Sequence, residues 1–379
     1  MDYFMPTRLY TGTDCIVKHA DALRALGSSC AIITGKHAAK ASGALDDVTR
    51  ALDGAGVTAC IWDGVTENPP VAACAEAGRF AADNGAQFIL GIGGGSALDA
   101  AKAVAVFAAN PTLDETGFYA KAWANKPLPI ALVGTTAGTG SEVTKVSVLT
   151  DAAHRKHSIH DDLLYATVAF GDSRHTRTCS TPTTLSCGVD ILAHATESYF
   201  SHKADEISRA FSVRAIRLAA DPLKLAGSGG LSTAKRLDDK LLDAPQRQDL
   251  YEASILGGLA INTTGTCFPH NVGYYLTETY GIPHGFACAV FLPSMLAIVD
   301  EYDPVYAADF YEQIGMDSAE YRSLIEDYCL VDGIDVHMTP AEIEAALPRW
   351  ENNGSVKNTR ANVSLDDIRT ILTSLFVEA

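Results

Sequence analysis

The sequence predicts an α/β domain followed by an all-helical domain, and three observations carry this prediction. Between residues 30 and about 172, short apolar runs alternate with amphipathic stretches, as in a parallel sheet with helices on both faces. From about Ser180 onward, strand patterns nearly vanish and helical periodicity dominates. A glycine cluster, Gly93–Gly95, directly follows one of the predicted strands. We therefore expect an α/β domain over residues 1–179 and a helical domain over residues 180–379.

The elements of the first domain can be assigned in order from the spacing of apolar residues. Its strands are short apolar runs, and each is followed by a longer stretch with a helical pattern. Pro69 and Pro70 suit the start of the second helix, because proline is tolerated in the first helical turn. The expected strands are Cys30–Thr34, Val57–Trp62, Phe88–Gly91 and Pro129–Val133, and the expected helices are 37–54, 71–83 and 96–108.

The second domain is expected to begin between Asp172 and Pro182 and to consist of helices. The stretch from Gly227 to Ala244 is rich in glycine, serine and charge, and it predicts a loop between two of them. The expected helices are 186–203, 205–220, 248–262, 267–279, 286–299, 340–348 and 365–377.

Composition excludes several classes of function. The 379 residues are 47% hydrophobic, which is typical of a folded globular protein. A net charge of −17 gives no support to nucleic-acid binding or to an anionic membrane surface. Nine cysteines, an odd number with no CxxC pair, favour reduced thiols and a cytoplasmic location. No signal-peptide pattern is present in MDYFMPTRLYTG, and we expect no apolar run long enough to span a membrane.

Two polar, glycine-rich loops follow neighbouring strands. Gly93, Gly94, Gly95 and Ser96 join a strand to a helix, where backbone amides and the helix N-terminus favour a phosphate. A plain turn would have the same sequence. The second loop, Gly134–Thr144, follows the next strand, and its alternative interpretation is an ordinary loop with serine and threonine caps. Two such loops at one edge of a parallel sheet favour a dinucleotide site.

A metal site is predicted in the second domain. Asp190 and His194 lie four residues apart and share one face if their segment is helical, while His270 and His284 lie fourteen apart. One carboxylate and three imidazoles suit one divalent ion, Fe²⁺ or Zn²⁺. No cysteine is expected to join the set, which makes a thiolate-bound structural zinc less favoured. The alternative is that these histidines are hydrogen-bonded core residues.

Jointly, these motifs resemble the iron-dependent, or group III, alcohol dehydrogenases over nearly the whole chain. The resemblance is carried by GVTENP at 64–69, GGGSALDAAK at 93–102, TTAGTGSEVT at 135–144, GVDILAHATES at 188–198 and IPHG at 282–285. It implies an N-terminal dinucleotide-binding domain, a helical metal-binding domain and an active site in the cleft between them.

The resemblance also implies roles for individual residues. Asp190, His194, His270 and His284 would bind the metal. The pyrophosphate would be held by Gly94, Gly95 and Ser96, and the cofactor cleft would be shaped by Asp99, Thr135, Thr136 and Thr139. Lys156 matches a lysine that approaches the cofactor in relatives.

The chain departs from the family pattern at Tyr274. Relatives commonly carry a histidine four residues after the third ligand, where it can relay protons, and this chain has tyrosine there. Tyr274 and the ligand His270 are the two candidate catalytic residues. A tyrosine hydroxyl is a poorer acid–base near neutrality than an imidazole, so the alternative is that Tyr274 only packs the pocket wall.

A second departure concerns the cofactor. NAD-dependent relatives often have an acidic residue after the first of these strands, hydrogen-bonded to the ribose. This chain has Gly35 and Lys36 instead, which leave room and positive charge for a 2′-phosphate. We expect NADP(H) to be favoured over NAD(H), although Lys36 also fits a solvated surface lysine.

The expected function is reversible hydride transfer between NAD(P)H and a small primary alcohol or aldehyde by a homodimer or larger homo-oligomer. A lyase resembling dehydroquinate synthase shares the fold, a metal and a nicotinamide cofactor, but such enzymes usually present glutamate where this chain has Asp190. A non-catalytic scaffold, such as a filament subunit, would not need the four ligands and both loops.

Overall fold

The computed structural model describes residues 3–227, 242–330 and 334–377 and divides into two compact units. The α/β unit comprises Phe4–Cys179. The helical unit comprises the described residues from Ser180 onward together with Tyr3.

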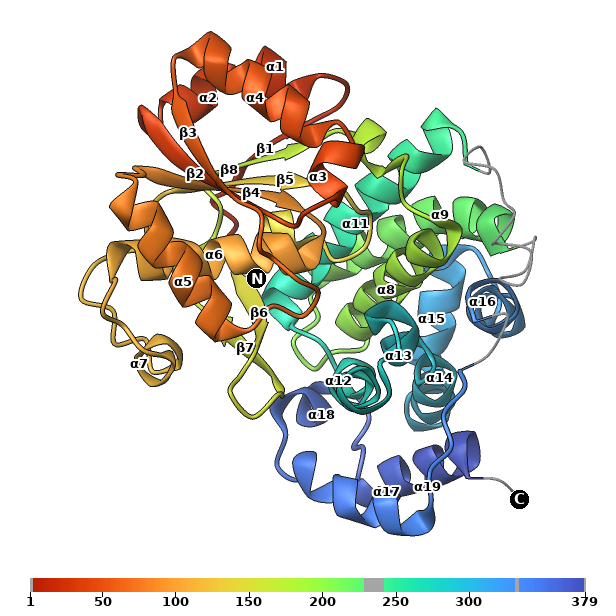
Figure 1. Ribbon diagram of the computed structural model, residues 1–379. Coiled ribbons are helices and arrows are strands. Elements are labelled where there is room, and N and C mark those ends of the chain that lie inside the picture. The colour runs from red at the N-terminus through yellow and green to blue at the C-terminus, as the bar shows by residue number, and fades with distance from the viewer. Residues whose placement is uncertain (1–2, 228–241, 331–333, 378–379) are drawn as a thin grey trace. The chain divides into compact units, whose positions relative to one another are not determined.

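A parallel sheet forms the centre of the α/β unit, as the sequence predicts (Figure 1). Within the described residues it has six strands in the order β1-β8-β5-β4-β2-β3, and every neighbouring pair is parallel. The strands are β1 (Arg8–Thr11), β2 (Ser29–Thr34), β3 (Thr58–Trp62), β4 (Phe88–Gly93), β5 (Ile130–Gly134) and β8 (Val168–Gly171). The four predicted strands therefore exist, with ends shifted by at most two residues.

Helices cover both faces of this sheet, as expected. Along β5, Ile130 and Leu132 pack into a core with helices α5 and α6, whereas Ala131 and Val133 pack into a second core with α1, α2 and α4 (Figure 1). Alternate side chains point to opposite faces, so a sheet buried on both sides must be apolar at every position. The helices are α1 (Cys15–Lys18), α2 (Ala20–Arg24), α3 (Ala38–Ala41), α4 (Ala44–Ala55), α5 (Val71–Asp83), α6 (Gly95–Ala109) and α7 (Glu115–Tyr119), with short 3-10 turns η1 (Ser141–Val143), η2 (Asp162–Leu164) and η3 (Ser173–Thr176).

Two details of the α/β unit differ from the prediction. The expected helix 37–54 is interrupted at Gly43, whose φ of 78° is left-handed and ends the first segment. In addition, an antiparallel hairpin pairs β6 (Val146–Thr150) with β7 (Lys156–His160). The hairpin was not predicted, because its strands are only five residues long and partly exposed, and β7 is mostly polar.

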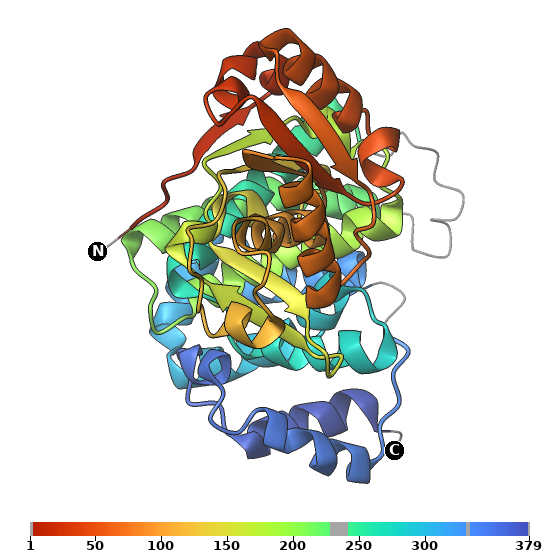
Figure 2. The same cartoon turned by 60° about the vertical axis from the view of Figure 1, so that its left-hand side comes forward.

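The helical unit has no regular strand among its described residues. In Figures 1 and 2, α8, α9 and α11 pack side by side, and the C-terminal α17 and α19 pack against each other. The elements are α8 (Thr181–Tyr199), α9 (Glu206–Gly227), α11 (Ala244–Thr264), α12 (Phe268–Tyr280), α13 (His284–Ala289), α14 (Leu292–Tyr302), α15 (Pro304–Ile314), α16 (Ser318–Ser323), the π-helix η4 (Leu324–Cys329), α17 (Pro340–Ala346), the 3-10 turn η5 (Leu347–Arg349), α18 (Gly354–Asn358) and α19 (Leu365–Phe376).

Helix boundaries in this unit correct two expectations. The single helix expected over 286–299 is two helices, because α13 ends at Ala289 and α14 begins at Leu292 with Pro293 in its first turn. The helix expected over 205–220 continues to Gly227. Of the expected loop from Gly227 to Ala244, residues 228–241 lie outside the described residues.

The expectation that no apolar run reaches membrane-spanning length was wrong. His284–Tyr302, at 19 residues, has sufficient length and apolar character, but half of it is buried inside the protein. The stretch comprises α13 and α14 rather than one continuous helix. A core helix of a globular protein passes the same test, so the stretch is weak evidence for a membrane span.

Candidate functional site

Helix α8 carries three buried ionisable side chains on one stripe. Asp190, His194 and Glu197 follow each other at intervals of four and three residues, which places them on one helix face. Ser180 begins the helix, because its hydroxyl accepts a hydrogen bond from the Thr183 amide at 3.3 Å. The stripe presents one imidazole and two carboxylates to the interior of the helical unit.

Two glycines let α12 and α13 approach closely enough to add their histidines. A Cβ atom on Gly285 would lie 1.8 Å from the Ser186 carbonyl oxygen of α8. A Cβ atom on Gly273 would lie 2.7 Å from the Ala287 carbonyl oxygen, where α12 crosses α13. Only glycine fits at either contact. These contacts hold His270, near the start of α12, and His284, the first residue of α13, beside α8.

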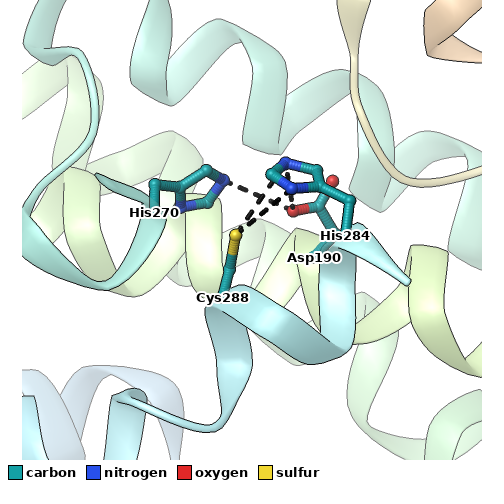
Figure 3. Close-up of side chains that lie close together, drawn as sticks. All are labelled: Asp190, His270, His284 and Cys288. Carbon is teal, nitrogen blue, oxygen red and sulfur yellow. Dashed lines mark hydrogen bonds and ion pairs between the residues drawn. The ribbon is translucent and has the colours of Figure 1, made fainter. Parts of the chain in front are cut away.

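The predicted metal ligands converge on one carboxylate oxygen. Asp190 Oδ1 lies 3.4 Å from His270 Nε2, 3.8 Å from His194 Nε2 and 3.9 Å from His284 Nε2. Donors bound to one ion at ~2.0–2.2 Å in a tetrahedral arrangement lie roughly 3.4 Å apart, so the spacing suits a shared ion. In Figure 3, dashed lines join Asp190 to His270 and to His284.

Two atoms at the centre of this cluster are buried and lack a hydrogen-bond partner among the described residues. They are Asp190 Oδ1 and His270 Nε2. Burying such atoms unpaired costs about 1–3 kcal/mol each, so the donor set fits an ion that both atoms would bind. Burial by itself would raise the pKa of Asp190, but His194, His284 and His270 outweigh it and hold that pKa below its ordinary value.

Glu197 belongs to this cluster, although the sequence analysis did not single it out. Its Oε1 accepts a hydrogen bond from His270 Nδ1 at 2.5 Å, and its Oε2 accepts one from the Cys267 amide at 2.7 Å. With Nδ1 donating to Glu197, His270 presents Nε2 to the cluster, which is the usual arrangement behind a metal-binding histidine. The sequence does indicate Glu197 by its spacing, because it lies three residues after His194 and therefore shares a helix face with it.

His270 is charged more readily here than an ordinary histidine. Burial lowers its pKa, but Cys288, Glu197 and Asp190 together raise it well above the usual value. A cation binding at Nε2 would replace that proton, because a histidine ligand must be neutral at the bound nitrogen.

The sequence predicted no cysteine in the metal-binding set, but the structure places one thiol within the cluster of donors. Cys288 lies four residues after His284 on α13 and is fully buried. Its sulfur lies 3.5 Å from His284 Nδ1 and 3.8 Å from Nε2, and it clusters with donors of Asp190, His270 and His284 (Figure 3). Cys288 lies one helical turn after His284, and the spacing of the aspartate and histidines does not indicate it.

Tyr274 lies beside the cluster, as its position four residues after His270 on α12 requires. Its ring stacks on the His284 imidazole with centroids 5.5 Å apart and planes inclined by 22°. This contact involves the ring of Tyr274 and suits a residue that packs against a metal-binding histidine. A proton relay would depend on the hydroxyl, which a functional test must address.

We expect Tyr274→Phe to be nearly neutral, because phenylalanine preserves the volume and the ring contact with His284. If the hydroxyl relays a proton, turnover should instead fall by ~10²-fold or more at unchanged metal content. Parallel pH–rate profiles of the two proteins decide between these outcomes. A limb lost in the variant establishes the relay, and superimposable curves exclude it.

In the α/β unit, the two glycine-rich loops lie against each other. Gly93 at the end of β4 pairs with Gly134 at the end of β5. A Cβ atom on Gly94 would lie 3.1 Å from the Thr136 side chain, and one on Gly95 would lie 2.6 Å from that of Thr139. The loops therefore form one surface at the carboxyl ends of adjacent strands, and Gly95 begins helix α6.

Strand order places Gly35 next to these loops. The chain runs from β2 to the edge strand β3 and then returns to β4 on the other side of β2, so the connections diverge between β2 and β4. Ligands of such sheets bind outside the carboxyl ends of the two diverging strands. The Thr34 hydroxyl donates to the Ile92 carbonyl at 2.8 Å across this point. Gly35 follows Thr34 directly, and Lys36 is exposed.

Asp99 holds the second loop and the hairpin onto α6. Its Oδ1 accepts from the Ser141 hydroxyl at 2.6 Å, and its Oδ2 accepts from the Val148 amide at 2.9 Å. Lys102, which the sequence reasoning did not single out, is fully buried one turn later and donates to the Ser141 hydroxyl at 2.7 Å. Burial lowers the pKa of Lys102, and Asp99 partly offsets this. Both residues support the loop from within the unit.

The remaining predicted cofactor residues lie in three parts of the α/β unit. Thr135 is buried, and its amide donates to the Gly93 carbonyl at 2.9 Å, which ties the second loop to the first. Ser96 stands in the first turn of α6 and accepts a hydrogen bond from the Asn68 amide at 3.3 Å. Lys156 begins β7 of the hairpin, opposite Thr150.

The parallel sheet has helices on both faces, and glycine-rich loops lie near the point where its strand connections diverge. The chain also buries a cluster of side chains of the kinds that bind metals. Together these features define the class of metal-dependent enzymes with a nucleotide cofactor. Comparison with known proteins narrows the class. Residues 6–173 match the family described as iron-containing alcohol dehydrogenase, and residues 184–327 match the C-terminal domain of the Fe-containing alcohol dehydrogenase family. The chain belongs to the iron-containing alcohol dehydrogenase family.

Individual relatives agree with this assignment. Long-chain-alcohol dehydrogenase 1 of Geobacillus thermodenitrificans is 32% identical over 310 residues, which cover 80% of this chain and 75% of that protein. The NAD-dependent methanol dehydrogenase of Bacillus methanolicus is 27% identical over 300 residues, covering 78% and 75%. The crystal structure of an iron-containing alcohol dehydrogenase from Thermotoga maritima superposes with a TM-score of 0.86 at 31% identity and covers 99% of both chains.

These findings confirm the predicted fold class and the predicted activity. The protein is a metal-dependent alcohol dehydrogenase or aldehyde reductase that transfers a hydride between a nicotinamide cofactor and its substrate. The comparisons give no support to the dehydroquinate-synthase-like alternative.

Proposed function

We propose that Asp190, His194, His270 and His284 bind one divalent ion, Fe²⁺ or Zn²⁺, at which a small primary alcohol or aldehyde reacts. The observation that carries this proposal is the approach of three imidazole nitrogens to within 3.4–3.9 Å of one buried carboxylate oxygen. When bound, the ion would supply Lewis acidity for an alcohol or carbonyl oxygen.

The protein's own contribution at this centre is orientation and exclusion of water. Glu197 holds the His270 ring by its Nδ1, and Asp190, His194 and His270 are all buried. His284 is partly exposed, with 28% of its side chain accessible, so this side of the cluster is where a small substrate would enter. Tyr274 stacks on the same imidazole and would line that entrance.

The α/β unit is proposed to bind the dinucleotide and the helical unit the metal. Gly94, Gly95 and Ser96 would hold the pyrophosphate at the N-terminus of α6, where backbone amides and the helix dipole favour phosphate. Thr135, Thr136 and Thr139 on the adjoining loop, which Asp99 supports, would complete this surface, and Lys156 would approach the cofactor from β7.

NADP(H) is the proposed preferred cofactor. Gly35 follows β2 at the switch point without an acidic side chain, and Lys36 beside it is exposed. The methanol dehydrogenase of Bacillus methanolicus is NAD-dependent by name, so the preference rests on Gly35 and Lys36 of this chain.

Gly35→Asp should lower the NADPH:NADH ratio of kcat/KM by about tenfold or more, because a carboxylate repels the 2′-phosphate and accepts the ribose hydroxyl. A Cβ atom at this position would lie 3.1 Å from the Val65 carbonyl oxygen, so some activity is lost through crowding alone. Gly35→Ala is the matched control, since it adds the same atom without charge and should leave the ratio unchanged. A wild-type ratio that favours NADH would refute the proposed preference.

Substrate and metal are tested together. Protein purified without oxygen is analysed for bound metal and assayed with a panel of short aldehydes, following NADPH and NADH absorbance. Turnover of short aldehydes with about one ion per chain is expected, and absence of either contradicts the proposal. The protein is further proposed to act in the cytoplasm, where its nine cysteines stay reduced. It is proposed to form a homodimer or larger homo-oligomer, which sedimentation measures.

A further inference from the structure

We propose that Cys288 is a sulfur donor to the ion of this centre and biases the centre toward Zn²⁺ over Fe²⁺. The inference rests on the metal binding proposed above, and it adds a ligand that the aspartate and histidine spacing does not contain. Four donor groups, those of Asp190, His270, His284 and Cys288, have ligand atoms that all lie within 4.8 Å of one another.

The position of the sulfur matches that of a ligand. An ion at ~2.3 Å from sulfur and ~2.1 Å from nitrogen separates those two atoms by roughly 3.1–3.8 Å for bond angles of about 90–120°. Cys288 Sγ lies 3.8 Å from His284 Nε2. In Figure 3 the thiol points toward the space between His270, His284 and Asp190.

Local structure holds the thiol in this place. Cys288 lies one turn after His284, so both side chains share a face of α13. The close contact of Gly285 with the Ser186 backbone fixes this helix against α8, which carries Asp190. The thiol is thus directed by the same contact that positions the histidine.

A second observation points to a bound ligand independently of the cysteine. Asp190 and His270 are only 3% and 2% exposed, and their atoms Oδ1 and Nε2 lack hydrogen-bond partners among the described residues. Both atoms face the cluster that contains the sulfur. An ion bound there would satisfy all of these donors at once.

The chemistry of sulfur sets the expected metal preference. One carboxylate and three imidazoles accept Fe²⁺ and Zn²⁺ alike, whereas a thiolate is a soft ligand that favours Zn²⁺. Binding forms one metal–sulfur bond and breaks the S–H bond, and the proton passes to water, so no oxidant or reductant is required.

The test is competitive reloading of the metal-free protein. The full-length wild type and Cys288→Ser are stripped with a chelator, reloaded without oxygen with equimolar Fe²⁺ and Zn²⁺, and analysed for bound metal. The bound Zn:Fe ratio is expected to fall by about tenfold or more in Cys288→Ser, because serine cannot supply the soft donor. Cys329→Ser is the control, since Cys329 is a buried free thiol of the same unit outside the cluster.

X-ray absorption of the zinc-loaded wild type tests the ligand without any substitution. A sulfur scatterer at ~2.3 Å is expected beside the nitrogen and oxygen shell at ~2.0–2.2 Å. A shell of nitrogen and oxygen alone would overturn the role of Cys288 and leave the proposed function standing. Failure of the wild type to bind either metal would overturn both.

Discussion

His270→Ala is expected to lower kcat/KM by more than ~100-fold, beyond the usual loss for residues that only support a ligand. The substitution removes the imidazole nearest to Asp190 Oδ1, at 3.4 Å, and it also leaves the buried Glu197 carboxylate without its partner at Nδ1. Metal content should fall with activity. Cofactor affinity should persist, because the residues proposed to bind the dinucleotide belong to the other unit.

Three measurements check this prediction: steady-state turnover of one aldehyde, metal per chain after anaerobic purification, and NADPH affinity by fluorescence titration. His337→Ala is a suitable control, because His337 is an exposed imidazole of the same unit, with 68% of its side chain accessible, and lies outside the cluster. Unchanged turnover in His270→Ala would remove the basis for the proposed centre.

Glu197→Gln is expected to weaken metal binding by about 10- to 100-fold, the usual cost of losing a partner behind a metal-binding histidine. Glu197 accepts hydrogen bonds from both His270 Nδ1 and the Cys267 amide. A glutamine side chain has one oxygen, so its NH₂ group would face one of these two donors. The His270 ring then loses either its orientation or the charge that makes Nε2 a stronger ligand.

The response to added metal distinguishes a residue that supports a ligand, such as Glu197, from a residue that is itself a ligand. Excess Zn²⁺ or Fe²⁺ should restore much of the turnover of Glu197→Gln, whereas it should not restore that of His270→Ala. Affinity is measured by competition with a chelating dye. Glu206→Gln serves as the control, since Glu206 lies in the same unit with 76% of its side chain exposed. Equal metal affinity in Glu197→Gln and the wild type would show that Glu197 only fills space.

Local periodicity was enough to predict part of the proposed metal centre. Asp190 and His194 share a helix face because of their spacing, and no knowledge of the rest of the fold is needed to see this. The same holds for the alternation of strands and helices and for the loop at Gly93–Gly95, which directly follows an apolar strand. These features depend on residues close in sequence, so the chain alone determined them.

Contacts between distant segments determined the rest of the proposed cofactor and metal sites. Gly35 lies next to the glycine-rich loops because the strand order puts β2 beside β4. This order is set by how helices pack on the two faces of the sheet. The α8 stripe of Asp190, His194 and Glu197 meets the side chains of α12 and α13 because glycines at 273 and 285 allow three helix backbones to approach closely. Such an approach depends on the shapes of all three helices together, and residue spacing within one helix does not contain that information.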